Sequence, residues 1–435
     1  MSNPSERYKI LVILTLALLS VFCKAGSPDT IFVVKNDSPG MSSHEVNLLK
    51  AAKTGGIRGA ILQAKRGDVI MVTPGFYQEG NIIIDKKLTL IGLDYPVLDG
   101  NDSCEVITIL ADSVSLKGFQ IQNCGVSYVT EKAGIRVDQH SYCIVENNRL
   151  LNTFFGIYMK NAHHCIIRNN YIEGQAKDEF SSGNAIHLWY SGDILVEGNT
   201  CKGHRDGIYL EFTDNSTISG NKSEHNLRYG LHFMFSNDDH YIGNTFRDNG
   251  AGVAVMFSNH ITMVHNHFEH NWGSSAYGLL LKDISDAEIT GNTFSENTVG
   301  IYGDGANRVR MEKNEFKGNG WALKILGSCG NDTITGNNFL SNTFDVFTNS
   351  NVSYNFFDGN FWSDYTGYDL DKNGIGDVPY KPVKLFCYMV SRVPQAIILL
   401  RSPFVDLVNF AEKVMPSLTP QSLEDTSPLM KKIIL

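Results

Sequence analysis

The segments GIYL (207–210), GLHF (230–233) and GVAV (252–255) are three copies of one pattern, a small residue followed by alternating apolar residues. Copies begin at positions 134, 156, 185, 207, 230, 252, 278, 300 and 322, so the successive steps are 22, 29, 22, 23, 22, 26, 22 and 22. A column of asparagines follows the copies at a nearly constant offset: Asn148, Asn170, Asn199, Asn221, Asn244, Asn266, Asn292, Asn314 and Asn337. Because both columns shift together across the longer steps, they indicate one repeating structural unit.

A unit of about 22 residues with two or three short strands is typical of one coil of a parallel β-helix. Side chains alternate along a strand, so the second and fourth residues of each copy should point into a dry core. A further inward column includes Met263 and Met311, and a third includes Phe246, Phe268 and Phe294. We expect the asparagines to form a buried amide ladder, bonded from coil to coil about 4.8 Å apart. The predicted fold is therefore all-β.

The chain is expected to contain five parts. The 435 residues begin with a basic and then apolar segment that ends at Cys23-Lys24-Ala25, which predicts a signal peptide cleaved after Ala25; a lipid anchor on Cys23 is the rival interpretation. The predicted parts are a signal peptide (1–25), an N-terminal cap with first strands (26–100), the coils (101–350), an Asp/Gly-rich segment (351–382) and an amphipathic helical tail (383–435).

Charge and cysteine content limit the function classes. The formal net charge of −9 argues against a nucleic-acid partner bound through phosphates. Seven scattered cysteines remain after Cys23, which does not indicate a small disulfide-stapled scaffold. Cys143 and Cys165 are separated by one repeat step and should stack as buried thiols, although a disulfide between neighbouring coils would also satisfy the spacing.

The C-terminal segment YNFFDGNFWSDYTGYDLDKNGIGDVPYKP (354–382) narrows the choice among β-helix proteins. Together with AKRGDVIMVTPGFYQE (64–79) and IDKKLTLIG (84–92), it resembles the NosD family, periplasmic maturation proteins of nitrous oxide reductase. The resemblance implies a right-handed, non-enzymatic β-helix in the periplasm that supplies copper to the copper–sulfide centre of the reductase. It also implies an ABC-type permease and ATPase, a copper chaperone and the reductase as partners, and peripheral membrane association through the permease.

The register of the coils predicts a copper site. His232 and Met234 should share the outer face of one strand, and Met256 should lie beside Met234 on the next coil. Thioether and imidazole groups suit Cu(I), so we expect transient Cu(I) binding here; unspecialised surface residues are the alternative. His187, Trp189 and Tyr209 should form an adjacent aromatic patch for a partner protein.

Two further metal sites are weaker expectations. Asp369, Asp371, Asn373 and Asp377 have the spacing of a calcium loop, with Gly374 at the turn, but Tyr380 occupies the position of the terminal Glu. An Asx-rich turn without metal is the alternative. His260, His265, His267 and His270 form a histidine-dense stretch that would suit a divalent metal on the surface.

The rival functions are a carbohydrate-active lyase or epimerase and a passive surface module. The enzyme would need clustered carboxylates with an acid or base, and the candidate groups are His204, Arg205, Asp206 and Glu211, or Asp238, Asp239 and His240. In the tail, Ser402-Pro403 should start a helix whose apolar stripe includes Phe404, Leu407 and Val408. That stripe would cap the last coil, dock on a permease, or do both.

Overall fold

The computed structural model describes residues 28–34, 56–127, 130–180, 182–350, 354–415, 419 and 423–434. The chain divides into two compact units, Met1–Ile172 and Glu173–Leu435. The predicted signal peptide lies outside the described residues.

The first unit contains coils of a parallel β-helix, in which strands from successive coils pair in parallel. The first sheet is formed by β1 (Thr30–Val33), β2 (Val69–Val72), β5 (Thr89–Gly92), β8 (Ser115–Lys117), β11 (Ile144–Glu146) and β14 (Ile166–Arg168). The second is formed by β3 (Phe76–Tyr77), β6 (Val97–Asp99), β9 (Gln120–Gln122), β12 (Arg149–Leu151) and β15 (Tyr171–Glu173). The third is formed by β4 (Ile82–Ile84), β7 (Ile107–Ile109), β10 (Ala133–Asp138) and β13 (Phe155–Lys160).

The second unit repeats the same three-sheet coil, which confirms the predicted right-handed parallel β-helix. Its first sheet is formed by β17 (Leu195–Glu197), β20 (Thr217–Ser219), β23 (His240–Ile242), β26 (Thr262–Val264), β29 (Glu288–Thr290), β32 (Arg310–Glu312), β35 (Thr333–Thr335) and β38 (Phe356–Asp358). Its second is formed by β18 (Thr200–Lys202), β21 (Lys222–Glu224), β24 (Thr245–Arg247), β27 (His267–Glu269), β30 (Thr293–Ser295), β33 (Glu315–Lys317), β36 (Asn338–Leu340) and β39 (Phe361–Trp362).

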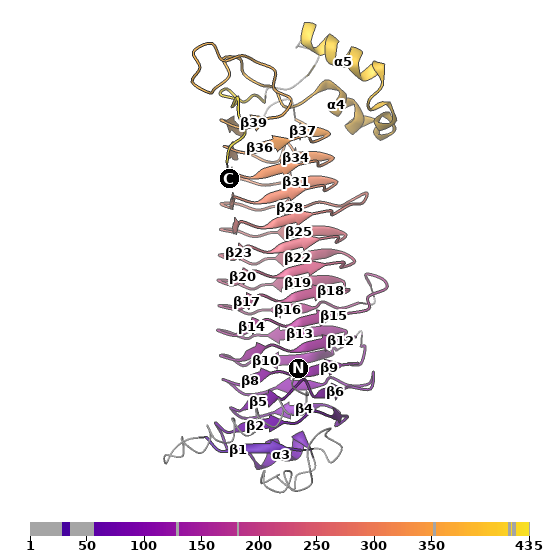
Figure 1. Cartoon of the computed structure of the whole chain (residues 1–435), viewed down its shortest axis with the longest axis vertical. Helices are drawn as coiled ribbons and strands as arrows, with labels where there is room; N and C mark the ends of the chain where they lie inside the picture. The colour runs from indigo at the N-terminus through magenta and orange to yellow at the C-terminus, as the bar shows by residue number, and fades with distance from the viewer. Residues whose placement is uncertain are drawn as a thin grey trace, which may run out of the picture. The chain divides into compact units, whose positions relative to one another are not determined.

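The third sheet of the second unit, which we call sheet C, carries the candidate site. It is formed by β16 (Ile186–Trp189), β19 (Asp206–Glu211), β22 (Tyr229–Met234), β25 (Ala251–Met256), β28 (Leu279–Lys282), β31 (Val299–Asp304), β34 (Trp321–Ile325) and β37 (Phe344–Phe347). These strands follow one another in chain order from β16 to β37 (Figure 1). Each coil therefore adds one strand to the face on which the outward residues align.

The interior is the predicted apolar core. Phe246, Phe268, Phe294, Phe316 and Phe339 stack on successive coils, with ring centroids 4.5–5.5 Å apart. Met263 and Met311 are buried among the inward residues, as predicted. In the first unit, Cys143 and Cys165 are free, buried thiols, and the Cys143 N–H donates to Cys165 Sγ at 3.3 Å.

The asparagine columns form the predicted ladder. From Asn199 to Asn337, the backbone and side-chain amides of each asparagine donate to the Oδ1 of the asparagine on the next coil. A second ladder, which was not predicted from the sequence, is formed by Asn226, Asn249, Asn271, Asn297, Asn319 and Asn342. Buried backbone amides at two turns of each coil thus find acceptors.

Both units contain helices next to their coils. At the N-terminal end, α3 (Ile57–Gln63) lies within the predicted cap and buries Ile57, Ala60 and Ile61. At the C-terminal end, α4 (Leu385–Arg392), the 3-10 helix η1 (Pro394–Leu399) and α5 (Pro403–Val414) follow the last coil. Phe386, Cys387 and Val390 of α4 pack with Phe344 and Phe347 of β37, which closes the open end of the core.

The coils extend beyond the predicted range of 101–350. Strands β2 to β6 already pair as coils before residue 101, and β38 and β39 continue the sheets to residue 362. The expected helical tail ends at Val414, since residues 423–434 instead return to the last coil. Asp425 bridges Phe357, and Leu429 bridges Phe361.

Asp425 forms the last rung of the first asparagine ladder. Its Oδ2 accepts hydrogen bonds from the Asn360 N–H at 3.0 Å, the Asn360 side-chain amide at 2.9 Å and the Trp362 indole N–H at 2.9 Å. An aspartate suits this position because the last rung needs to accept hydrogen bonds but has no next coil to donate to.

Candidate functional site

The three predicted copper ligands lie on the outer face of sheet C, on β22 and β25. Met234 pairs directly with Met256 across these strands, and His232 lies two residues before Met234. Both methionines are half-buried. The two thioethers and the imidazole therefore share one face of two adjacent strands, as the strand alternation predicts.

Tyr209 lies between His187 and His232. Its ring centroid is 4.8 Å from that of His187 and 4.5 Å from that of His232, and the Tyr209 and His232 rings are nearly parallel at 8°. Because a whole ring separates the two imidazoles, they cannot bind the same ion. The Tyr209 hydroxyl also donates a 3.6 Å hydrogen bond to Met234 Sδ. The candidate ligand set is thus His232 with the methionine pair, and Tyr209 positions one thioether.

A buried ion pair lies beneath His232. Asp206 is completely buried and accepts two hydrogen bonds from Arg228, at 2.9 Å from Nε and 2.6 Å from Nη2. Arg205 Nε lies 3.5 Å from the same carboxylate. His232 Nδ1 is 3.3 Å from Arg228 Nη2 and 4.0 Å from Asp206 Oδ2. Arg205 and Asp206 were predicted as candidate groups of an enzyme, whereas Arg228, which reaches Asp206 from the next coil, follows from no sequence motif.

Burial keeps the His232 imidazole neutral at pH 7. Removal from water lowers the pKa of His232 to about 4, although the nearby Asp206 acts in the opposite direction. Arginine is a donor without an acceptor, so its contact with Nδ1 places the imidazole proton on Nε2. Nε2 is buried and has no hydrogen-bond partner among the described residues. A soft metal ion binds Nε2 of this uncharged ring only after the ring proton moves from Nε2 to Nδ1, which breaks the contact with Arg228 and releases no proton to solvent.

The predicted partner patch is less accessible than expected. His187 and Tyr209 lie on the outer face, but only 8% of each residue is exposed, because neighbouring rings cover their faces. Burial also lowers the pKa of His187, while the pKa of Glu211 is held below its usual range by the His187 imidazole 3.8 Å away. Trp189 is half-buried at the end of β16. Direct docking on His187 and Tyr209 remains a prediction that their burial does not support.

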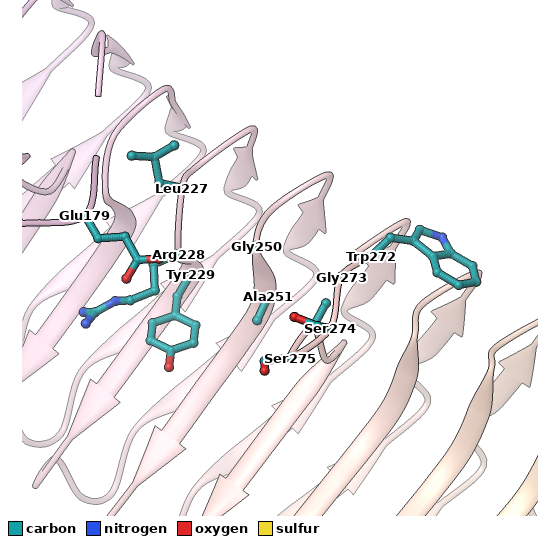
Figure 2. A pocket seen from close by; sticks show the side chains of 11 residues that line it. Glu179, Leu227, Arg228, Tyr229, Gly250, Ala251, Trp272, Gly273, Ser274 and Ser275 are labelled. Carbon is teal, nitrogen blue, oxygen red and sulfur yellow. The ribbon is translucent and has the colours of Figure 1, made fainter. Parts of the chain in front are cut away.

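A pocket of about 360 Å³ opens beside the strands of the site. Its floor is formed by Gly250 and Ala251, and Figure 2 shows Arg228 and Tyr229 on one side and Trp272 on the other. Glu179 and residues 272–276 belong to the segments that lengthen two coils beyond the usual repeat step. These two long steps are the sequence signal for the pocket.

The four histidines of the predicted divalent-metal site contact different residues and do not converge on one point. His260 contacts Asp238 at 3.5 Å, His270 contacts Glu296 at 3.1 Å, and His265 contacts the Gly291 carbonyl oxygen at 3.3 Å, while His267 is exposed on β27. The described part of the chain holds no group of three or more His, Cys, Asp or Glu side chains placed for a metal ion. Met234 and Met256 would bind a metal through thioether sulfur atoms, which are not among these four side-chain types.

The Asp-rich loop bonds to its own backbone. Asp369 accepts hydrogen bonds from the Asn373 and Gly374 amides, Asp371 accepts from the Asn373 side chain, and Asp377 accepts from the Leu370 amide. These contacts are those of the Asx-rich turn. Calcium binding at these residues remains a prediction.

The tail helix α5 has two apolar faces. Val405 is buried in the cluster with α4 and β37, and Val408 is packed against that cluster. Leu407, Phe410 and Val414 are 64–68% exposed, and Phe404 is 40% exposed. The helix therefore helps to cap the last coil and also presents apolar side chains to solvent. Among the described residues, no helix combines the length and the apolar character needed to cross a membrane.

Comparison with known proteins shows a similarity to NosD proteins. Residues 172–367 match the family model described as "Periplasmic copper-binding protein (NosD)". Over 371 residues, the chain is 29% identical to the "Probable ABC transporter binding protein NosD" of Pseudomonas aeruginosa, covering 81% of this chain and 86% of the relative. Over these residues, the chain is similar to NosD proteins. A NosD of Stutzerimonas stutzeri is 33% identical over 73 residues, which is 17% of each chain.

The solved structures support the fold. The Dettilon tailspike protein superposes with a TM-score of 0.55 at 14% identity, over 75% of this chain and 70% of the tailspike. At that identity the likeness concerns the β-helix alone.

The motif that suggested NosD has a structural role here. Trp362 stacks on Phe339 with centroids 4.0 Å apart, ends the aromatic core column and donates to Asp425. Tyr380 packs against Trp362 at 5.1 Å and bridges Asp425. The NosD-like segment therefore closes the last coil. The matched range of residues 172–367 also contains every candidate copper ligand.

Proposed function

We propose that this NosD-like chain is a periplasmic, non-enzymatic accessory protein that holds Cu(I) transiently at His232, Met234 and Met256. The observation that carries the proposal is the direct pairing of two half-buried methionines beside a neutral imidazole on one sheet face. Soft thioether ligands select Cu(I) over hard divalent ions, and a site of so few ligands releases its cargo readily. The relatives' names support delivery together with an ABC transporter.

The proposed partners follow from the family. Copper would arrive from a copper chaperone and leave for the copper–sulfide centre of nitrous oxide reductase, in concert with an ABC-type permease and ATPase. The exposed apolar side chains of α5, including Phe404 and Leu407, support docking of the tail on the permease, with Val408 holding the helix on the cap. That contact would provide the peripheral membrane association.

The burial of two of the four candidate carboxylates, those of Asp206 and Asp239, favours an accessory role over a carbohydrate-active enzyme. Asp206 and Asp239 are completely buried, and Asp206 is bonded to Arg228. Burial also raises the pKa of Asp239 to about 9, so that this carboxyl is protonated at neutral pH. A lyase or epimerase needs an acid or base that reaches the substrate, and neither carboxyl does so.

Anaerobic Cu(I) titration of the mature protein against a competing chelator tests the proposal. We expect stoichiometric binding by the wild type and about a hundredfold weaker binding by the Met234→Ala/Met256→Ala variant, because both soft ligands are lost. Met415→Ala is the matched control, since Met415 is a half-exposed thioether on the tail, 54% exposed and remote in sequence from the site. If the double variant binds Cu(I) as tightly as the wild type, the copper site does not lie at Met234 and Met256. If the wild type binds no Cu(I), the copper role is refuted.

The pH dependence of Cu(I) affinity distinguishes His232 from the exposed histidines. Because the pKa of His232 is about 4, protons should compete with Cu(I) at this imidazole only near and below that pH. We expect the competition from His232 to leave the affinity nearly constant from pH 8 to pH 5 and to weaken it below pH 5. A site of exposed imidazoles would weaken from about pH 6.5 downwards. In a His232→Ala variant, the Cu(I) affinity should no longer weaken below pH 5. A wild-type affinity that weakens with a midpoint near pH 6.5 would contradict the assignment of His232 as the ligand.

A further inference from the structure

Four aromatic residues stack along one edge of sheet C. Tyr190, Phe212, Phe235 and Phe257 each directly follow the last residue of β16, β19, β22 or β25. Successive ring centroids are 4.6, 5.1 and 5.0 Å apart, and the ring planes differ by 12°, 7° and 14°. We call these four residues the aromatic ladder. Their regular spacing, with one ring on each coil, was visible in the sequence.

The backbone at these positions does not favour aromatic residues. All four have positive φ values, from 48° to 55°, a conformation that large side chains rarely adopt. In other coils, the residue with positive φ that follows the corresponding strand is Gln139, Asn161, Asp283 or Gly305. Asparagine, aspartate and glycine suit the left-handed conformation, and none of the four residues is aromatic. The local turn therefore does not explain why four successive coils have aromatic rings there.

The ladder exposes ring edges rather than ring faces. Tyr190, Phe235 and Phe257 are 47%, 38% and 40% exposed, whereas the stacking covers the faces between neighbours. Sugars stack on open ring faces, so the ladder is poorly suited to an oligosaccharide. A continuous apolar strip of edges instead suits the apolar side chains of a protein surface.

The turns beside the ladder are acidic. The segments 189–193, 211–215, 234–238 and 256–260 contain Asp193, Glu211, Asp214 and Asp238 but neither lysine nor arginine. Asp193, Asp214 and Asp238 are exposed. A partner with complementary charge therefore has lysine or arginine side chains around an apolar centre, because opposite potentials steer docking and oppose wrong partners.

The ladder adjoins the proposed copper site. Phe235 and Phe257 directly follow Met234 and Met256 in the chain, so a protein seated on the ladder lies beside both thioethers. We propose that the aromatic ladder is the docking surface for a protein with a basic, apolar-centred face that exchanges Cu(I) with this site. This inference rests on the proposed copper function and adds the contact through which the cargo is handed over.

Surface plasmon resonance with the mature chain tests the docking surface. The probes are the purified copper chaperone and purified apo nitrous oxide reductase of the same source, each measured without copper. We expect at least one probe to bind, and the Phe212→Asn/Phe235→Asn/Phe257→Asn variant to bind it about tenfold or more weakly, as loss of a central apolar contact does. Asparagine occupies the equivalent position at Asn161, so the turn should keep its conformation.

Tyr142→Asn is the matched control. Tyr142 is also exposed, has a φ of 59° and stacks on His164 with centroids 5.1 Å apart, but it belongs to a different turn in the first unit. The control should bind the probe as the wild type does, and Asp214→Asn/Asp238→Asn should slow association at low salt. Equal binding by the ladder variant and the wild type, or no binding of either probe by the wild type, overturns the proposal.

Chelator titration separates the two proposals. The ladder variant should keep wild-type Cu(I) affinity, because its substituted residues are not among the proposed ligands. If the wild type binds a probe through the ladder but binds no Cu(I), the copper function fails while the docking surface stands.

Discussion

The Asn292→Ala variant is expected to lose about 3–5 kcal/mol of unfolding free energy, because several buried hydrogen-bonding groups lose their partners together. Asn292 Oδ1 accepts from the backbone and side-chain amides of Asn266, at 2.8 and 3.0 Å. Its own side-chain amide donates to the Met263 carbonyl oxygen at 2.9 Å and to Asn314 Oδ1 at 3.1 Å. Alanine would leave both Asn266 donors and the Met263 carbonyl unsatisfied in the dry interior.

Urea unfolding followed by circular dichroism measures the loss, with hydrogen exchange at the Asn266 amide as a local readout. Asn259→Ala is the matched control, since Asn259 is an exposed asparagine of the same region. Its hydrogen bonds compete with water, so a change of about 0.5 kcal/mol is expected. A loss below about 1 kcal/mol for Asn292→Ala would show that water or a relaxed backbone replaces the ladder.

The Arg228→Met variant is expected to lose about 3 kcal/mol, because it leaves the carboxylate of Asp206 buried without its main partner. Asp206 is completely buried, and Arg228 supplies two short hydrogen bonds to it. The expected loss lies at the lower end of the range for buried pairs because Arg205 remains 3.5 Å away and the Arg228 side chain is 31% exposed. Methionine keeps much of the side-chain volume, so the effect should be electrostatic.

The double variant Asp206→Asn/Arg228→Met is the control for this charge effect. Removing both charges should restore most of the lost stability, since an unpaired buried charge costs more than an absent pair. Urea unfolding of the wild type, both single variants and the double variant gives the coupling energy. A double variant as unstable as Arg228→Met would assign the loss to packing instead.

The repeat and the ligand pair could be predicted from the sequence because both depend on local periodicities. A regular repeat step places equivalent residues on neighbouring coils, and the two-residue alternation of a strand assigns them to the core or the surface. These two rules suffice to predict that Met263 and Met311 point into the core, that the asparagines form a ladder and that Met234 pairs with Met256.

The chemistry around the ligand pair was decided by the tertiary structure. Which outward residues are covered depends on contacts across coils, as when Tyr209 separates His187 from His232 and Arg228 reaches back to Asp206. Asp425 completes the ladder 65 residues after Asn360, because the chain leaves the coils, forms the capping helices and returns. Periodicity determines which side of a strand a residue occupies, but burial, and with it the neutral state of His232, depends on neighbours that the periodicity does not specify.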